Sequence, residues 1–288
     1  MSDSSVHINR HGYSATDAAE YDKVIASRYS TRIGRALLDK FTEEPNETVL
    51  DLSCHTGSVT LDILHRLGPK GRIVALESDP ELLNVARHKA RHELGKRVFF
   101  AAATSCDQWR FEDDVFSTVV GNLPFEDMAD PKATMHAVRR VLAPAGRILL
   151  TRMLQGSFQE MLDMFHEVAM ATNEQRVLQR ISTIRDRYLS ENAFVEFAQS
   201  VGFERVTLQS AEFALRFANA TDLQADPLLQ RIVLGEWQWI SEAGSDPRRF
   251  LEQAQHAMET YFSGQSIPLT IRYGLLEGYL PDEPARHD

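Results

Sequence analysis

The sequence predicts an α/β fold built around a doubly wound, mostly parallel sheet. Between residues 47 and 151, short apolar runs alternate with segments of helical periodicity. Two helical segments begin at Asp-Pro, at 79–80 and 130–131. Aspartate accepts hydrogen bonds from free amides of the first turn, and proline takes a position that needs no amide proton. Strands alternating with helices favour right-handed crossovers and a parallel sheet covered on both faces.

The first helix of this alternation has Val59, Ile63 and Leu67 at four-residue spacing, and Gly68-Pro69 ends it. The basic stretch 87–97 is interpreted as the solvated face of a later helix. The five strands expected in this half cover residues 48–52, 72–76, 98–101, 115–120 and 146–151.

The second half of the chain is organised differently. A sixth strand is expected at 203–208 and a last one at 269–275, where apolar residues alternate. The region 218–265 between them has a helical pattern. Because no linker or repeat divides the chain, we expect effectively one domain. It comprises an N-terminal helical cap, 1–45, and a main part, 46–288, with 218–265 as a helical insert.

Composition narrows the classes of partner. The 288 residues carry a net charge of −10, so a nucleic-acid partner would need a local basic patch and is not expected. No apolar run approaches the ~20 residues of a membrane-spanning helix. The two cysteines indicate no disulfide framework. The expected location is therefore the cytoplasm, without membrane contact.

In an open α/β sheet, ligands bind beyond the carboxyl ends of the strands, where the strand order reverses. Here Asp51 lies near the end of the first strand, and the small residues after it let backbone amides approach a ligand. Glu77 ends the second strand, where a carboxylate accepts hydrogen bonds from a ribose diol. Each acid alone has an ordinary structural explanation. Together, at adjacent strand ends, they favour a nucleoside ligand.

Six segments resemble the class I S-adenosylmethionine-dependent methyltransferases, in particular the small-molecule branch that contains quinone- and natural-product-biosynthesis enzymes. The resemblance implies a Rossmann-like sheet of seven strands with an antiparallel last strand. It also implies S-adenosyl-L-methionine as cofactor. The segments are AAEYDKVIASRY, VLDLSCHTGSVTLDIL, GRIVALESDPELLNVAR, RRVLAPAGRILLT, VGFERVTLQSAEFALRF and IPLTIRYGLLEG.

By position, the resemblance also implies a set of cofactor-binding residues. On the first strand and its loop, the set has a leading acid, Asp51, and three positions of a glycine loop. At the end of the second strand it has a ribose acid, Glu77, and the residue after it. The position near the adenine falls on Ser105 or alternatively Asp107. Two positions at the end of the fourth strand lie near the methionine part, and an N-terminal tyrosine could cover the cofactor. In chain order they are Tyr21, Asp51, Ser53, His55, Gly57, Glu77, Ser78, Ser105, Gly121 and Asn122.

The chain departs from the family pattern at several of these positions. Glycine is lost at Ser53 and His55, Ser105 replaces an acid, Ser117 replaces a frequent acid, and Ala145 replaces a glycine. The imidazole of His55 has three alternatives: it points to solvent, it donates a hydrogen bond to the cofactor carboxylate, or it intrudes on the cofactor. The last alternative would weaken binding and favour an inactive, methyltransferase-like binding or regulatory protein. We expect that the cofactor still binds.

The sequence assigns no catalytic residue, because alignment supplies much of the acceleration in methyl transfer from a sulfonium. Glu126, Asp127 and His11 are candidates for a base. His88 and His92 stand four apart, but without a further ligand nearby no metal site is expected.

The expected function is methyl transfer to oxygen, nitrogen or carbon of a small-molecule methyl acceptor. A nucleic-acid amino methyltransferase is the weaker alternative: Asn122-Leu-Pro-Phe125 resembles a motif of such enzymes, and a turn explains it equally. A dinucleotide-dependent dehydrogenase is disfavoured, because no G-x-G-x-x-G follows the first strand. The oligomeric state stays open, a homodimer included.

Overall fold

The computed structural model describes residues 12–42, 47–103, 105–126, 128 and 130–282. Two compact units divide the chain. The sheet unit comprises Gly12–Arg152, Glu191–Gln209 and the residues from Gly274 onward. The helical unit comprises Met153–Ser190 and Ser210–Tyr273. The domain boundaries expected from the sequence stay a prediction.

Seven strands in the described residues form one sheet, in the order β3-β2-β1-β4-β5-β7-β6. The first five strands pair in parallel, and β7 is antiparallel, which confirms the expected fold class. The order reverses between β1 and β4, so the carboxyl ends of these two strands mark the expected ligand position. The strands are β1 (Thr48–Leu52), β2 (Arg72–Glu77), β3 (Val98–Ala102), β4 (Phe116–Asn122), β5 (Leu142–Met153), β6 (Glu204–Phe217) and β7 (Ile267–Tyr279).

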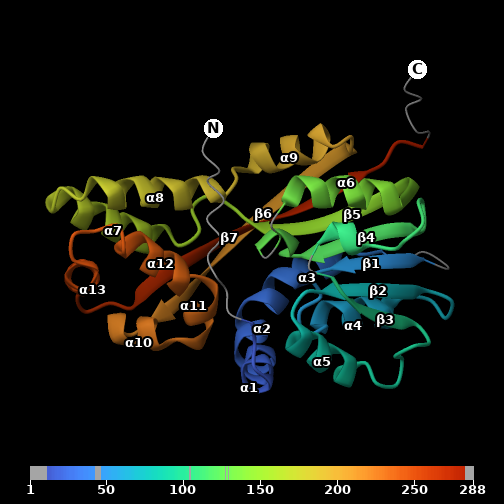
Figure 1. Ribbon diagram of the computed structural model, residues 1–288, viewed down its shortest axis with the longest axis horizontal. Helices are drawn as coiled ribbons and strands as arrows, with labels where there is room; N and C mark the ends of the chain where they lie inside the picture. Colours follow the sequence, from blue (N-terminus) through green and yellow to red (C-terminus); the bar gives the residue numbers. More distant parts are fainter. Residues whose placement is uncertain (1–11, 43–46, 104, 127, 129, 283–288) are drawn as a thin grey trace. The chain divides into compact units, whose positions relative to one another are not determined.

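Helices of the sheet unit pack along its strands. In Figure 1, α4 and α5 lie beside β2 and β3, whereas α6 lies beside β5 and α9 beside β6. Asp79 and Asp130 cap α5 and α6, each followed by the expected proline. The helices of this unit are α1 (Ala15–Glu20), the π-helix η1 (Tyr21–Ile25), α2 (Ala26–Arg28), α3 (Ser30–Lys40), α4 (Ser58–Arg66), α5 (Pro80–Lys89), the 3₁₀ turns η2 (Cys106–Gln108) and η3 (Pro124–Glu126), α6 (Pro131–Val141) and α9 (Glu191–Ser200).

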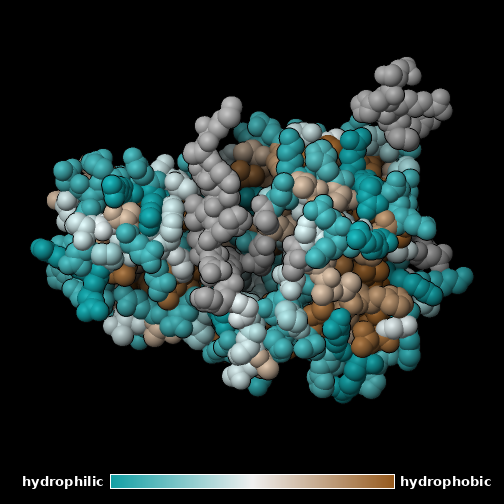
Figure 2. Space-filling view, in the orientation of Figure 1, coloured by the Kyte–Doolittle hydropathy of each residue, from teal (hydrophilic) through white to brown (hydrophobic). Residues whose placement is uncertain are grey.

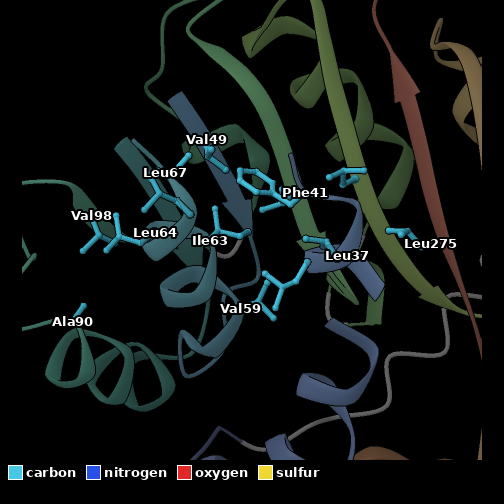
Figure 3. Close-up of a cluster of buried hydrophobic side chains, with 14 residues drawn as sticks. Leu37, Phe41, Val49, Val59, Ile63, Leu64, Leu67, Ala90, Val98 and Leu275 are labelled. Atoms are coloured by element: carbon cyan, nitrogen blue, oxygen red, sulfur yellow. The ribbon is translucent and has the colours of Figure 1, made fainter. Parts of the chain in front are cut away.

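One apolar cluster fixes α3 and α4 against the sheet. Ile63 and Leu64 of α4 are buried beside Val49 of β1, with Leu37 and Phe41 of α3 next to them (Figure 3). Each of these five side chains has 4% or less of its surface exposed. The beginning of α4, which follows the predicted cofactor loop, is therefore held by the core.

The amino ends of the strands contain a buried ion pair. Arg147 on β5 donates to Glu47 across 3.3 Å and to the Thr42 carbonyl across 2.7 Å. Its guanidinium also lies 5.3 Å from the centre of the Phe41 ring. Glu47 accepts a further hydrogen bond from the Thr118 hydroxyl. This end of the sheet is tied together by charged and polar side chains that face away from the expected ligand position.

The helical unit has its own core. Phe165 of α7 contacts Trp237 and Phe250, with ring centres 6.2 and 5.6 Å apart. A buried carboxylate, Glu236, accepts from Arg187 at 2.8 Å. The expected insert is helical, and two of its aromatic side chains belong to this core. The helices of the unit are α7 (Gln159–Ala171), α8 (Gln175–Arg187), α10 (Ala220–Ala225), α11 (Pro227–Ile232), α12 (Leu234–Ser241) and α13 (Pro247–Tyr261).

One expected helix is shorter than the sequence suggested. In the basic stretch 87–97, only residues 87–89 belong to α5, which ends at Lys89. The rest forms turns that lead to β3, so the interpretation of the stretch as one helix face is wrong. Arg97, at the end of the stretch, is not on a solvated helix face: its guanidinium donates to the carbonyls of Leu67 and Gly68, just after α4. Hydrophobic residues gather on the surface around β3 in Figure 2, where Leu94 and Phe99 are each 40% exposed.

Candidate cofactor site

The loop after β1 takes a strained, tightly bonded path. Ser53 and His55 have φ angles of 54° and 50°, in the left-handed region that favours glycine. Gly57 has φ 76°, and a Cβ there would lie 2.9 Å from the Cβ of Ala86. Glycine therefore remains at the position where α4 approaches α5, and the two substituted positions keep the glycine-like backbone.

Asp51 is the most deeply buried acid of this site, with 1% of its surface exposed. Its carboxylate accepts from the Thr60 hydroxyl at 2.6 Å. Burial raises the pKa of Asp51 to about 7, while the Thr60 hydrogen bond and the charge of His55 act in the opposite direction. A buried carboxyl in this condition gains from a cationic partner, since a positive charge favours its ionised form.

Glu77, at the end of β2, is held by backbone amides. Its Oε1 accepts from the amides of Ser78 at 2.8 Å and Asp79 at 3.0 Å. Its Oε2 accepts from the amide of His55 at 2.8 Å. The two acids that the sequence paired thus lie at neighbouring strand ends, and the cofactor loop is bonded directly to the second of them.

The His55 imidazole faces the protein interior, with 14% of the side chain exposed. Its Nδ1 lies 3.8 Å from Glu77 Oε2, and its ring centre is 5.7 Å from that of Tyr21. Its Nε2 is buried and has no hydrogen-bond partner among the described residues. The alternative in which His55 points to solvent is therefore wrong.

The N-terminal helices are bonded over this loop. Asp22 accepts from the Thr56 hydroxyl at 2.6 Å and from Lys89 Nζ at 2.7 Å. Lys89 also donates to Ser58 at 2.9 Å. Tyr21 is 4% exposed and begins the π-helix η1, an irregularity that is frequent at functional sites. The sequence singled out Tyr21 and missed Asp22, although the two are neighbours.

At the end of β4, the side chain of Asn122 makes hydrogen bonds within the fold. Asn122 Nδ2 donates to the Ser30 carbonyl at 2.8 Å, and its Oδ1 accepts from Thr151 at 2.9 Å. At Gly121 a Cβ would meet Pro124 at 2.8 Å, so glycine allows the turn. Phe125 is 7% exposed and packs edge-on against Phe194 of α9. The segment Asn122–Phe125 therefore has the contacts of a packed turn.

A small pocket lies where these elements meet. Four of the ten predicted cofactor residues line it: Asp51, Ser53, His55 and Asn122. The start of α3, which no sequence motif indicated, also contributes polar residues to this space. The remaining lining residues are Ser30, Thr31, Cys54, Thr56, Ser58 and Val59.

Other candidates lie elsewhere or are engaged. Ser105 is exposed and accepts from the Asp107 amide at 3.3 Å. Burial, reinforced by the charges of Asp51 and Glu77, raises the pKa of the Cys54 thiol, so it is no reactive thiolate. Glu126 lies in the turn after β4, half-buried. His11 and Asp127 lie outside the described residues.

The paired histidines also separate from one another. His88 belongs to α5, whereas His92 lies in the following turn and accepts from Arg91 at 3.1 Å. In the described parts of the chain, no three His, Cys, Asp or Glu side chains gather as a metal site. The helices of those parts also lack the length and apolar character that crossing a membrane requires.

Comparison with known proteins agrees with this geometry. A family described as methyltransferase domain matches residues 43–193, more than half of the chain. A ubiquinone/menaquinone biosynthesis C-methyltransferase UbiE from Wigglesworthia glossinidia brevipalpis is 25% identical over 115 residues. That alignment covers 40% of this chain and 46% of the relative, so the chain spans less than half of the length of that protein.

Two further comparisons cover most of the chain. A malonyl-(acyl-carrier protein) O-methyltransferase from Paenibacillus is 24% identical over 86% of this chain and 84% of its own length. The crystal structure of the YcgJ protein from Bacillus subtilis has a TM-score of 0.58 at 16% identity, covering 88% of this chain and all of that one. The latter shows likeness of fold alone. The chain belongs to the class I S-adenosylmethionine-dependent methyltransferase family.

Proposed function

We propose that this protein transfers a methyl group from S-adenosyl-L-methionine to a small molecule. The observation that carries the proposal is the pairing of Asp51 and Glu77 at adjacent strand ends, beside a pocket at the reversal of strand order. Each acid suits one part of the cofactor. Asp51, with a pKa raised to about 7, would hold the ammonium group, and Glu77 would accept from the ribose diol.

When bound, the cofactor supplies an electrophilic methyl group, whose transfer leaves the electron pair of the broken carbon–sulfur bond on sulfur. The residues of this chain would act by position: Asp51 and the loop amides would orient one end of the cofactor, beside the residues of α3 and α4 that line the pocket. The proton of the acceptor leaves to solvent or to a side chain that we do not assign.

A small molecule is the acceptor class that the observations favour. The net charge of −10 opposes a nucleic acid, and Asn122 and Phe125 are already engaged in packing. The names of the curated relatives refer to ubiquinone and menaquinone biosynthesis and to malonyl-(acyl-carrier protein). The proposal covers an oxygen, a nitrogen or a carbon atom of the acceptor as the atom that receives the methyl group.

An inactive binding or regulatory protein is the second candidate, and one observation favours it: the His55 imidazole lies against Glu77. Calorimetric titration with S-adenosylmethionine and S-adenosylhomocysteine separates the two. We expect micromolar dissociation constants and about tenfold weaker binding in Glu77→Gln, with Glu112→Gln, an exposed position, as control. Absence of binding to protein freed of copurified ligand would contradict the enzyme and support the second candidate.

A further inference from the structure

We propose that the His55 imidazole competes with the cofactor ribose for Glu77 and thereby sets the affinity for the cofactor. This inference rests on the proposed function. It makes His55 a residue that determines affinity in a position where the family has glycine.

The hydrogen bonds of Glu77 show where the competition occurs. The two oxygens of a carboxylate offer about four acceptor positions. At Oε1, the amides of Ser78 and Asp79 take both, and the Ser78 hydroxyl is a further, longer donor at 3.3 Å. At Oε2, the amide of His55 takes one, at 2.8 Å. One acceptor position is therefore left for a ligand hydroxyl, and it belongs to the oxygen that the imidazole faces.

The imidazole occupies the approach to that oxygen. Nδ1 lies 3.8 Å from Oε2, too far for a good hydrogen bond but close enough to exclude a hydroxyl from between the two. On its other side the ring lies against Tyr21, at 5.7 Å between centres and with 31° between planes. A ribose that bonds to Oε2 must move the imidazole out of this position.

The same contacts show that the imidazole is displaceable. Its Nε2 is buried without a hydrogen-bond partner among the described residues, which is unfavourable. Its backbone has φ 50°, a conformation that glycine adopts freely and asparagine tolerates, so substitutions can separate the backbone from the imidazole. The arrangement is thus weakly held, and the cofactor binds to the fraction of molecules in which His55 has turned away. If this fraction is about one tenth, the apparent affinity is about tenfold lower than the intrinsic one.

The test compares two substitutions of His55 by titration with S-adenosylhomocysteine. His55→Gly removes the imidazole and the backbone restriction, whereas His55→Asn removes the imidazole and keeps a residue that tolerates the left-handed conformation. We expect both to bind about tenfold more tightly than the unmodified protein. Ala145→Gly, which relaxes another positive φ at 60° far along the chain, controls for a general gain in stability and should leave the affinity unchanged.

A second probe examines the hydroxyls. Adenosine should gain affinity in His55→Asn, whereas 2′,3′-dideoxyadenosine, which has no diol to reach Glu77, should not. A gain in His55→Gly alone would attribute the effect to backbone strain and overturn the proposal. Weaker binding in both variants would show that His55 holds the cofactor, and would also overturn it. If no variant binds, the proposed function itself is wrong and the inference fails with it.

Discussion

The two ends of the strands in the sheet unit use buried charge in opposite ways. At the amino ends, Arg147 meets Glu47 at 3.3 Å, and further bonds to Thr42 and Thr118 surround the pair. At the carboxyl ends, Asp51 is equally buried but has no cation bonded to it among the described residues, and its pKa is raised to about 7. The difference teaches that a buried carboxyl can be balanced by a cation from its own fold, as Glu47 is by Arg147, or can instead have a raised pKa, as Asp51 has. Under the proposed function, the cofactor ammonium group would be the cation that Asp51 lacks.

The largest expected effect is at the amino ends. Arg147→Met should destabilise the protein by about 3 to 5 kcal/mol, because Glu47 would stay buried without its partner. Unfolding in urea measures this. Arg140→Met breaks the exposed pair with Asp113 and should cost at most about 1 kcal/mol. Equal losses in the two variants would remove the distinction between a buried and an exposed ion pair here.

At Asp51, by contrast, we expect a substitution that removes the charge to increase the free energy of unfolding at high pH. Since its folded pKa of about 7 exceeds the ordinary value of 3.8, its contribution to stability is present below pH 3.8 and is lost as the pH rises to 7. Asp51→Asn, which still accepts from Thr60, removes this loss. Its advantage over the unmodified protein should be about 2 to 3 kcal/mol greater at pH 8 than at pH 5.

Urea unfolding at the two pH values checks this prediction. Asp62→Asn, an exposed position on α4, is the control for loss of a carboxylate. An advantage of Asp51→Asn that does not change with pH would show that Asp51 does not titrate in this window. The same variant should bind the cofactor more weakly, so that stability and binding change in opposite directions.

The smallest expected effect separates two helix caps. Asp79 caps α5 and also accepts from the amide of Tyr13 at 2.9 Å, whereas Asp130 caps α6 alone. Each change to alanine should cost about 1 kcal/mol for the cap. Asp79→Ala should cost about 1 kcal/mol more, since the N-terminal segment loses its tie as well. Thermal unfolding of both variants measures the difference, and identical losses would mean that the Tyr13 bond contributes nothing.

The sequence predicted the elements better than the contacts between them. Local signals placed both Asp-Pro helix starts, because capping depends on neighbouring residues. The bonds of Arg97 to the carbonyls just after α4 join distant parts of the chain instead, which no local pattern contains. The seven strands and the antiparallel β7 were implied by the family resemblance, whereas the order of the strands comes from the structure.

The candidate site shows the same limit. The positions of Asp51 and Glu77 at strand ends followed from the pattern of apolar runs. The orientation of His55 did not, because it depends on Tyr21 and Glu77, which the fold brings to it from distant parts of the chain. The ion pair of Asp22 and Lys89 could not be predicted for the same reason. Each residue alone is an ordinary charged position on a helix, and the fold brings the two side chains to 2.7 Å beside the loop after β1.

The division of β6 and β7 between the two units has a consequence for engineering. In the described residues, the chain passes between the units within β5 after Arg152, after Ser190, within β6 after Gln209 and within β7 after Tyr273. The helical unit is therefore not a cassette that a single excision removes. Exchanging it for that of a relative requires two simultaneous grafts, and three of these four junctions must preserve the alternation of side chains along a continuous strand.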